Sequence, residues 1–172
     1  MSDSTQQPEA APEHCMEVTV HENHEWLKQF LGEWTFENEA RMGPDQPPMK
    51  STGTEIARML GDVWMIANGE GEMPDGSTGR WIMTLGWDPA PDCFVGSWVG
   101  SMMTHLWTYK GSLDADRKIL TLDCEGPGMA GGMAKYQDIH ELVSADHRIL
   151  RSRMQGEDGQ WIQFMEAQYR RK

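Results

Sequence analysis

The sequence predicts an all-β fold, an antiparallel up-and-down β-barrel of about ten strands with one short N-terminal helix closing one end. Three observations lead to this prediction. Apolar and polar residues alternate with a period of two from residue 34 onward, turn signals interrupt the alternation at regular intervals, and no helical periodicity follows residue 32. Sequential hairpins need no crossover connections, and closing the sheet removes the exposed edges of an open sheet.

The N-terminal part of the chain is predicted to contain a tail and a helix. Residues 1–18 are polar and rich in Pro, Gln, Ser and Glu, so they cannot bury enough apolar surface to offset the loss of conformational entropy. We therefore expect a disordered tail at 1–18 and a lipocalin-like barrel domain at 19–172. The domain opens with a short amphipathic helix that stops at Gly32. Its apolar residues at helical spacing are Trp26, Leu27, Phe30 and Leu31.

The expected strands follow from alternation and from turn residues. Gly61-Asp62 is a strong signal for a tight hairpin, and Asp88-Pro89 marks a later turn. Gly96 and Gly100 indicate bulges or bends within one strand. A barrel with more than about eight strands encloses more space than side chains fill, so we expect a cavity. The predicted strands lie near 34–42, 51–60, 63–72, 81–87, 94–102, 104–110, 118–125, 133–143, 148–155 and 160–170.

Charge and composition bear on partners and location. The net charge of −12 repels nucleic-acid phosphates and anionic membranes, so neither is expected as a partner. The sequence shows no signal-peptide pattern and no apolar run that would span a membrane, so we expect a cytoplasmic protein. Cys15, Cys93 and Cys124 are expected to be reduced thiols, with a bridge between Cys93 and Cys124 left open. A homodimer is among the assemblies that the sequence allows.

The segment from Trp98 to Tyr109 carries the most information about a binding site. Alternation places His105 and Trp107 on one strand face and Trp98 on the other, and a bulge at Gly100 would exchange the two faces. In the lumen, His105 would supply one titratable contact in an otherwise apolar pocket. The alternative is a structural or solvent-facing histidine.

Further candidates come from other strands. Tyr136 and His140 share a strand face near the Gly-rich loop 126–132, which would suit a portal. The full set of candidate ligand-binding residues is Met83, Trp98, Met103, His105, Trp107, Tyr136 and His140.

The motifs of several catalytic and binding classes are missing. The loop 126–132 lacks the Lys-Ser/Thr pair and the following helix of a phosphate-binding loop. Ser101 and His105 lie four residues apart on a predicted strand, about 13 Å, too far to form a nucleophile and base. We therefore predict no catalytic residue and no cofactor. No metal site is predicted either, because no closed zinc pattern is formed by His14, Cys15, His21 and His24.

Several motifs resemble one known family. HEWLKQFLGEW is followed by PPMKSTGTE, GEGEMPDG, IMTLGWDP, FVGSWVGSMMTHLW and FMEAQYRRK. Together, over residues 21–172, they resemble an uncharacterised bacterial lipocalin-like family of calycin-type barrels, catalogued as a domain of unknown function. The resemblance implies that Trp34 plugs one barrel end beneath Arg170 or Arg171. Haem-binding relatives use a histidine near the chain end, and this chain has none after His147.

Three functions remain open from the sequence. The first is a carrier or sensor that binds a small apolar or aromatic ligand inside the barrel. The second is an enzyme that uses the cavity with His105 or His140 as acid or base. The third is a structural or partner-binding barrel with a filled lumen.

Overall fold

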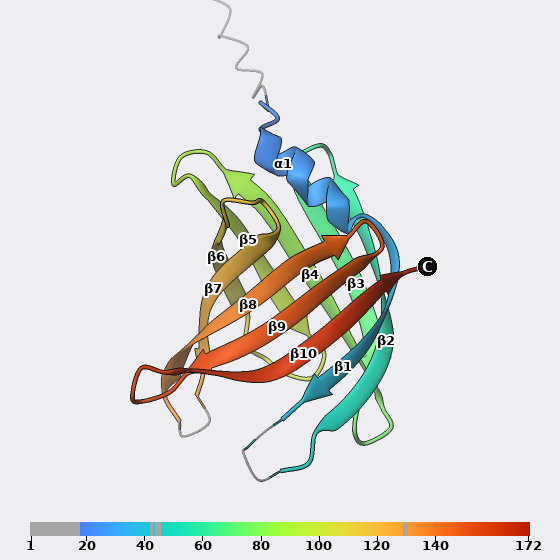
Figure 1. Ribbon diagram of the computed structural model, residues 1–172, viewed down its shortest axis with the longest axis vertical. Helices are drawn as coiled ribbons and strands as arrows, with labels where there is room; N and C mark the ends of the chain where they lie inside the picture. The colour runs from blue at the N-terminus through green and yellow to red at the C-terminus, as the bar shows by residue number, and fades with distance from the viewer. Residues whose placement is uncertain (1–17, 42, 44–45, 129–130) are drawn as a thin grey trace, which may run out of the picture.

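The ten strands formed by the described residues belong to a single sheet that closes on itself (Figure 1). The computed structural model describes residues 18–41, 43, 46–128 and 131–172. The predicted tail at 1–18 falls almost entirely outside the described residues. The strands are β1 (Gly32–Ala40), β2 (Met49–Leu60), β3 (Trp64–Glu72), β4 (Thr78–Asp88), β5 (Cys93–Gly100), β6 (Trp107–Leu113), β7 (Ile119–Pro127), β8 (Met133–Ser144), β9 (His147–Gln155) and β10 (Trp161–Arg171).

The strand order confirms the predicted up-and-down barrel. Each strand pairs antiparallel with its neighbours in the sequence, and β1 also pairs with β10 to complete the ring. Successive connections therefore alternate between the two ends of the barrel (Figure 1). The end that receives the N-terminal helix carries the β2–β3, β4–β5, β6–β7 and β8–β9 turns, and the opposite end carries the other loops.

A short helix covers one end of the barrel, as predicted. Helix α1 (Glu22–Leu27) continues as a 3₁₀ turn (Lys28–Phe30), and Leu27 and Phe30 are almost fully buried. Its N-terminus is closed by a capping box, in which the side chain of His21 accepts from a backbone N–H and His24 accepts from the N–H of His21. The chain then reverses into β1 at Gly32, whose φ of 110° favours glycine.

The structure corrects the prediction at the β5–β6 connection. Strand β5 ends at Gly100 and β6 begins at Trp107, so residues 101–106 form a loop rather than strand. The register between β4 and β5 is also unbroken through Gly96, where a bulge was expected. A side chain at Gly96 would collide with the Thr84 carbonyl, so this glycine allows close strand approach instead of bending the strand.

Glycines and aromatic rings share the inner surface of the barrel. The ring of Trp81 lies against Gly69, and the ring of Trp107 lies against Gly126, so closely that a Cβ atom at either glycine would overlap the ring. An aromatic ring that lies over a glycine covers the inner wall and extends little toward the barrel axis. This pairing helps to keep the lumen of the barrel open.

Trp34 forms the plug at the helix end of the barrel. It is 1% exposed, and its indole Nε1 donates to the Phe30 carbonyl over 2.8 Å. The Arg171 guanidinium lies 4.3 Å from the centre of the indole ring. The resemblance allowed Arg170 or Arg171 in this role, and the structure places Arg171 there rather than Arg170, since Trp34 pairs with Arg171 across β1 and β10 while Arg170 points outward beside Thr35. A difference of one residue along a strand exchanges the two faces.

Replacing these two arginines should therefore give different results. We expect Arg171→Ala to lower the free energy of unfolding by about 1–2 kcal/mol, because it removes the cation–π contact and bonds to backbone carbonyls. The matched control Arg170→Ala removes an exposed side chain and should cost less than about 0.5 kcal/mol. Urea unfolding of both variants measures the difference. Equal losses would contradict the assignment of Arg171 to the plug.

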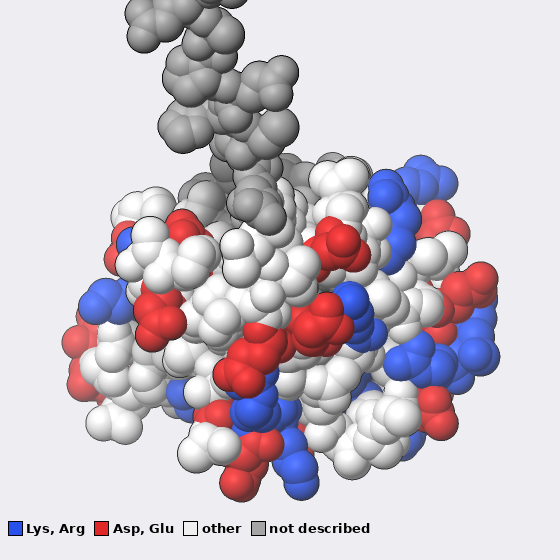
Figure 2. Space-filling view, turned by 90° about the horizontal axis from the view of Figure 1, so that it is seen from above, with Lys and Arg blue, Asp and Glu red and all other residues white. Residues whose placement is uncertain are grey.

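The outer surface carries mixed charge. Seen from the helix end, acidic and basic side chains alternate around the molecule rather than gathering into one field (Figure 2). Arg151 of β9, for example, contacts both Glu141 at 2.6 Å and Glu166 at 2.9 Å on the outside of the sheet. Within the described residues, no helix has the length and apolar character needed to cross a membrane.

Candidate functional site

The barrel contains a cavity of about 310 Å³. Its lining includes Met73 from the β3–β4 loop and Met102 and Met103 from the β5–β6 loop, which lie at the end opposite α1 (Figure 1). Met102 and Met103 are both exposed to solvent, so the cavity reaches the surface between these loops. The helix and Trp34 close the other end. The barrel is therefore closed at one end and open at the other.

The cavity wall is mainly aromatic and sulfur-containing. Tryptophan and methionine side chains suit ligands of varied shape, because the indole is large and rigid while the thioether is flexible and polarisable. The aromatic residues of the wall are Phe36, Trp81, Trp98, Trp107, Tyr109, Tyr136, Phe164 and Tyr169. The methionines are Met73, Met83, Met102, Met103 and Met165.

The structure brings together six of the seven candidate residues in this wall. Met83 of β4, Trp98 of β5 and Trp107 of β6 occupy adjacent strands and pair across them. The remaining three that line the cavity are Met103, Tyr136 and His140.

His105 is the candidate that does not line the cavity. It lies in the β5–β6 loop, where its Nε2 is 3.0 Å from the Glu125 carbonyl oxygen and its ring meets the edge of Trp107. The expected lumen position assumed that the strand continues through residue 105. Because β5 stops at Gly100, strand alternation no longer fixes the direction of this side chain. The structure places His105 at the open end of the barrel, where it links the β5–β6 loop to β7.

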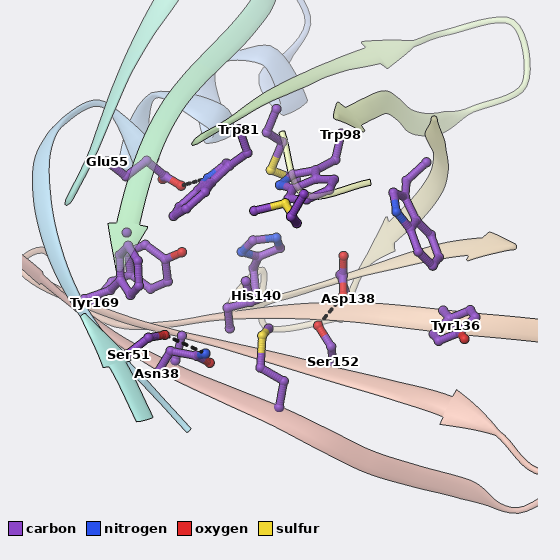
Figure 3. Close-up of a pocket in the computed structure, with 18 of the residues that line it drawn as sticks. Asn38, Ser51, Glu55, Trp81, Trp98, Tyr136, Asp138, His140, Ser152 and Tyr169 are labelled. Atoms are coloured by element: carbon purple, nitrogen blue, oxygen red, sulfur yellow. Dashed lines mark hydrogen bonds between the residues drawn. The ribbon is translucent and has the colours of Figure 1, made fainter. Parts of the chain in front are cut away.

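A buried ion pair forms the floor of the cavity. Glu55 of β2 accepts from the Arg148 guanidinium of β9, and both side chains are almost fully buried. Glu55 also accepts from Trp81 Nε1 over 3.3 Å (Figure 3). The guanidinium lies 3.8 Å from the centre of the Tyr169 ring and 4.9 Å from that of Trp34. The ion pair thus connects Trp34 at the closed end, through Arg148, with Glu55 in the cavity wall.

Asp138 of β8 is a further carboxyl group of the cavity wall, besides Glu55 and Glu72. It accepts from the Tyr109 hydroxyl over 2.6 Å and from the Ser152 hydroxyl (Figure 3). Asp138 is half-buried and lines the cavity. Desolvation by burial raises its pKa, against the opposing effect of the two hydrogen bonds. None of the ion pairs found among the described residues includes Asp138.

His140 follows Asp138 on the same face of β8. The residue is 3% exposed, and neither ring nitrogen has a hydrogen-bond partner in the described structure. The ring meets the edge of Phe30 at 5.4 Å between ring centres and lies in the cavity wall (Figure 3). Burial, and then the charge of Arg148, lower the pKa of His140 to about 3. The imidazole is therefore neutral near pH 7 and offers one donor and one acceptor nitrogen.

Sequence reasoning identified Tyr136 and His140 but missed the charged residues of the lumen. Asp138 lies between Tyr136 and His140 in the alternation of β8, so the pattern that selected those two already placed Asp138 beside them. Glu55 and Arg148 are 93 residues apart in the sequence, and their contact depends on closure of the whole barrel. No local pattern in the sequence indicates that pair.

The remaining polar groups near the cavity give no reactive centre. Cys124 lines the wall as a free thiol, and burial raises its pKa to about 12, so the thiolate is scarce near pH 7. Cys93 is also a free thiol. Of the residues weighed as metal ligands, His21 and His24 cap α1, whereas His14 and Cys15 lie outside the described residues.

Fold and cavity together define a closed antiparallel up-and-down β-barrel with one plugged end and one open end. The chain belongs to the DUF1579 family, described as a protein of unknown function, whose model matches residues 19–171. The family resemblance found in the sequence motifs is thereby confirmed. A search of the curated proteins finds no match.

Solved structures of similar shape share the fold. The crystal structure of Rv2717c from M. tuberculosis has a TM-score of 0.59 and 12% identity, covering 90% of this chain and 99% of that chain. The S-type phycobiliprotein lyase CPES from Guillardia theta has a TM-score of 0.55 and 11% identity, covering 87% of this chain and 92% of that one. At these identities the similarity extends to the barrel architecture alone.

Proposed function

We propose that the barrel binds one small, largely apolar or aromatic ligand in its lumen and acts as a carrier or sensor. The observation that supports this most is the cavity of about 310 Å³ with its wall of aromatic and methionine side chains. Small-molecule sites are concave, mostly apolar and about 300–1,000 Å³ in volume, with a few polar groups that orient the ligand. Asp138 and His140 are two polar groups of this kind in the wall.

The two other functions have less support. A structural barrel with a filled lumen fits poorly with a cavity that reaches the surface between Met102 and Met103. An enzyme that uses His140 as acid or base would need an imidazole that titrates near physiological pH. Burial instead lowers the pKa of His140 to about 3, and His105 does not line the cavity.

A cavity-filling variant tests the proposed function. Leu150 of β9 lines the cavity, and its neighbour Ile149 alternates to the outer face of the same strand. We expect the neutral compound 1-naphthylmethanol to bind the wild type saturably, with one molecule per chain, in isothermal titration calorimetry. Leu150→Trp should reduce the affinity at least tenfold because the added rings occupy ligand space. Ile149→Trp should bind like the wild type.

Two outcomes would contradict the proposed function. One is the absence of saturable binding to the folded wild type by this probe and by a panel of other small apolar molecules. The other is undiminished binding in folded Leu150→Trp. Ala167→Leu fills the same cavity from β10 and serves as a second variant if Leu150→Trp does not fold.

Cytoplasmic location and dimerisation belong to the same proposal. Free thiols at Cys93 and Cys124 favour a reducing compartment. Exposed apolar residues on the outer faces of β2 to β5, among them Ile56, Trp64 and Ile82, favour a second copy of the chain as a partner. The net charge of −12 weighs against nucleic acid and anionic membranes as partners.

A further inference from the structure

We infer that Asp138 binds a positively charged amine, so that the ligand of this barrel is an apolar or aromatic molecule carrying one protonated amino group. This inference rests on the proposed function, since it specifies the chemistry of the ligand in the same cavity. It starts from two residues of the lumen: Asp138, which has no ion-pair partner among the described residues, and His140, whose ring nitrogens have no hydrogen-bond partner there. Their charge and hydrogen-bonding capacity define what a complementary ligand must supply.

The first step concerns the charge of Asp138. An ionised carboxylate can accept about four hydrogen bonds, and Asp138 receives two, from the hydroxyls of Tyr109 and Ser152. Both donors are neutral, and no ion pair among the described residues reaches this carboxylate. A charge removed from water without an opposite charge is costly, which agrees with the raised pKa of Asp138. A cationic ligand would supply the missing charge.

The second step concerns the cation of the lumen. Arg148 already contacts Glu55, and its guanidinium lies among Tyr169, Trp34 and Phe30 below the cavity floor. It is therefore unavailable to an anionic ligand in the cavity. A carboxylate or phosphate in the cavity would meet Asp138 without a compensating positive charge.

The third step concerns the groups around Asp138. His140 is two residues away on the same strand face, about 7 Å along the backbone, and its ring nitrogens have no partner. The neutral imidazole can accept a hydrogen bond from an amine held at Asp138. Trp98, Trp107 and Tyr136 line the same cavity, and the faces of aromatic rings attract cations. Figure 3 shows the side chains of Asp138 and His140 directed into this space.

Three probes with the same ring system test the inference. These are 1-naphthylmethylamine, which is protonated near pH 7, the neutral 1-naphthylmethanol, and the anion 1-naphthoate. We expect the wild type to bind the amine at least tenfold more tightly than the alcohol, and the carboxylate more weakly than both. Calorimetry measures all three affinities at one fixed ionic strength. This is needed because salt screens the attraction between a cationic probe and the net negative charge of the protein.

Two matched variants identify the group responsible. Asp138→Asn keeps the side-chain shape and removes the charge, so in this variant the affinity for the amine should fall to that for the alcohol. Asp123→Asn removes the same charge from the outer face of β7, where Gln137 contacts it, and should retain the preference for the amine.

The outcomes separate the inference from the proposed function. If the wild type binds the alcohol and the amine equally, the lumen takes apolar ligands and the inference is overturned. If folded Asp138→Asn keeps the preference for the amine, the cation is held elsewhere and the inference is again overturned. If none of the three probes binds, the inference and the proposed function both fail. The comparison of probes in the wild type decides the question even where Asp138→Asn does not fold.

Discussion

Replacement of Trp34 by alanine is expected to lower the free energy of unfolding by about 3–5 kcal/mol, the range for removing a large buried aromatic side chain. The indole is 1% exposed, donates a hydrogen bond to the Phe30 carbonyl and contacts the guanidinium groups of Arg148 and Arg171. Its loss leaves a cavity at the helix end and removes a cation–π contact from each of the two guanidinium groups. Both effects act in the same direction.

Urea unfolding followed by circular dichroism measures this loss. Trp64→Ala is the matched control, since Trp64 lies on the outer face of β3 and is 40% exposed. We expect the control to lose about 1 kcal/mol or less. Insolubility of Trp34→Ala would agree with a large loss. If both variants lose the same small amount, Trp34 is not the plug of the barrel.

Breaking the floor ion pair should have an effect of similar size. In Arg148→Met the carboxylate of Glu55 stays buried without its cation, and removal of one partner from such a pair costs about 3–5 kcal/mol. The double variant Arg148→Met with Glu55→Gln removes both charges and should recover part of the loss. Thermal unfolding of the two single variants and the double variant gives the coupling between the residues.

The control for the floor is an ion pair on the surface. Arg80 and Glu70 lie 3.4 Å apart with exposed side chains, and such pairs contribute about 0–1 kcal/mol. Arg80→Met should therefore unfold close to the wild type. A double variant whose loss equals the sum of the two single losses would show that Glu55 and Arg148 stabilise the barrel independently.

Local patterns in the sequence were sufficient to predict the fold. Alternation and turn residues predicted ten sequential strands, and helical spacing before Gly32 predicted the cap, because both signals act within a few residues. The plug role of Trp34 was an implication of the family resemblance, and the side chain is buried at the helix end. The ends of the strands were predicted less accurately. Most of the loop at 101–106 was predicted as strand because polar and apolar residues alternate there as well.

The site was only partly predictable, since it depends on register and on distant contacts. One residue of register decides between Arg170 and Arg171, and only the pairing of β1 with β10 settles it. The candidates were mostly aromatic residues and methionines, the residue types that form the cavity wall. Six of the seven candidates therefore line the cavity. The charged floor requires strands β2 and β9 to face each other across the closed barrel, which no local segment specifies.

The most direct test of the proposed lumen site is the two-dimensional NMR spectrum of the indole N–H groups during titration with 1-naphthylmethanol. Trp81, Trp98 and Trp107 line the cavity, whereas Trp64 faces outward and Trp161 contacts Arg153 at 5.0 Å from the ring centre. Binding inside the barrel should shift the signals of the first three and leave those of Trp64 and Trp161 in place. Shifts confined to Trp64 and Trp161 would place the ligand on the outer surface and contradict a binding site in the lumen.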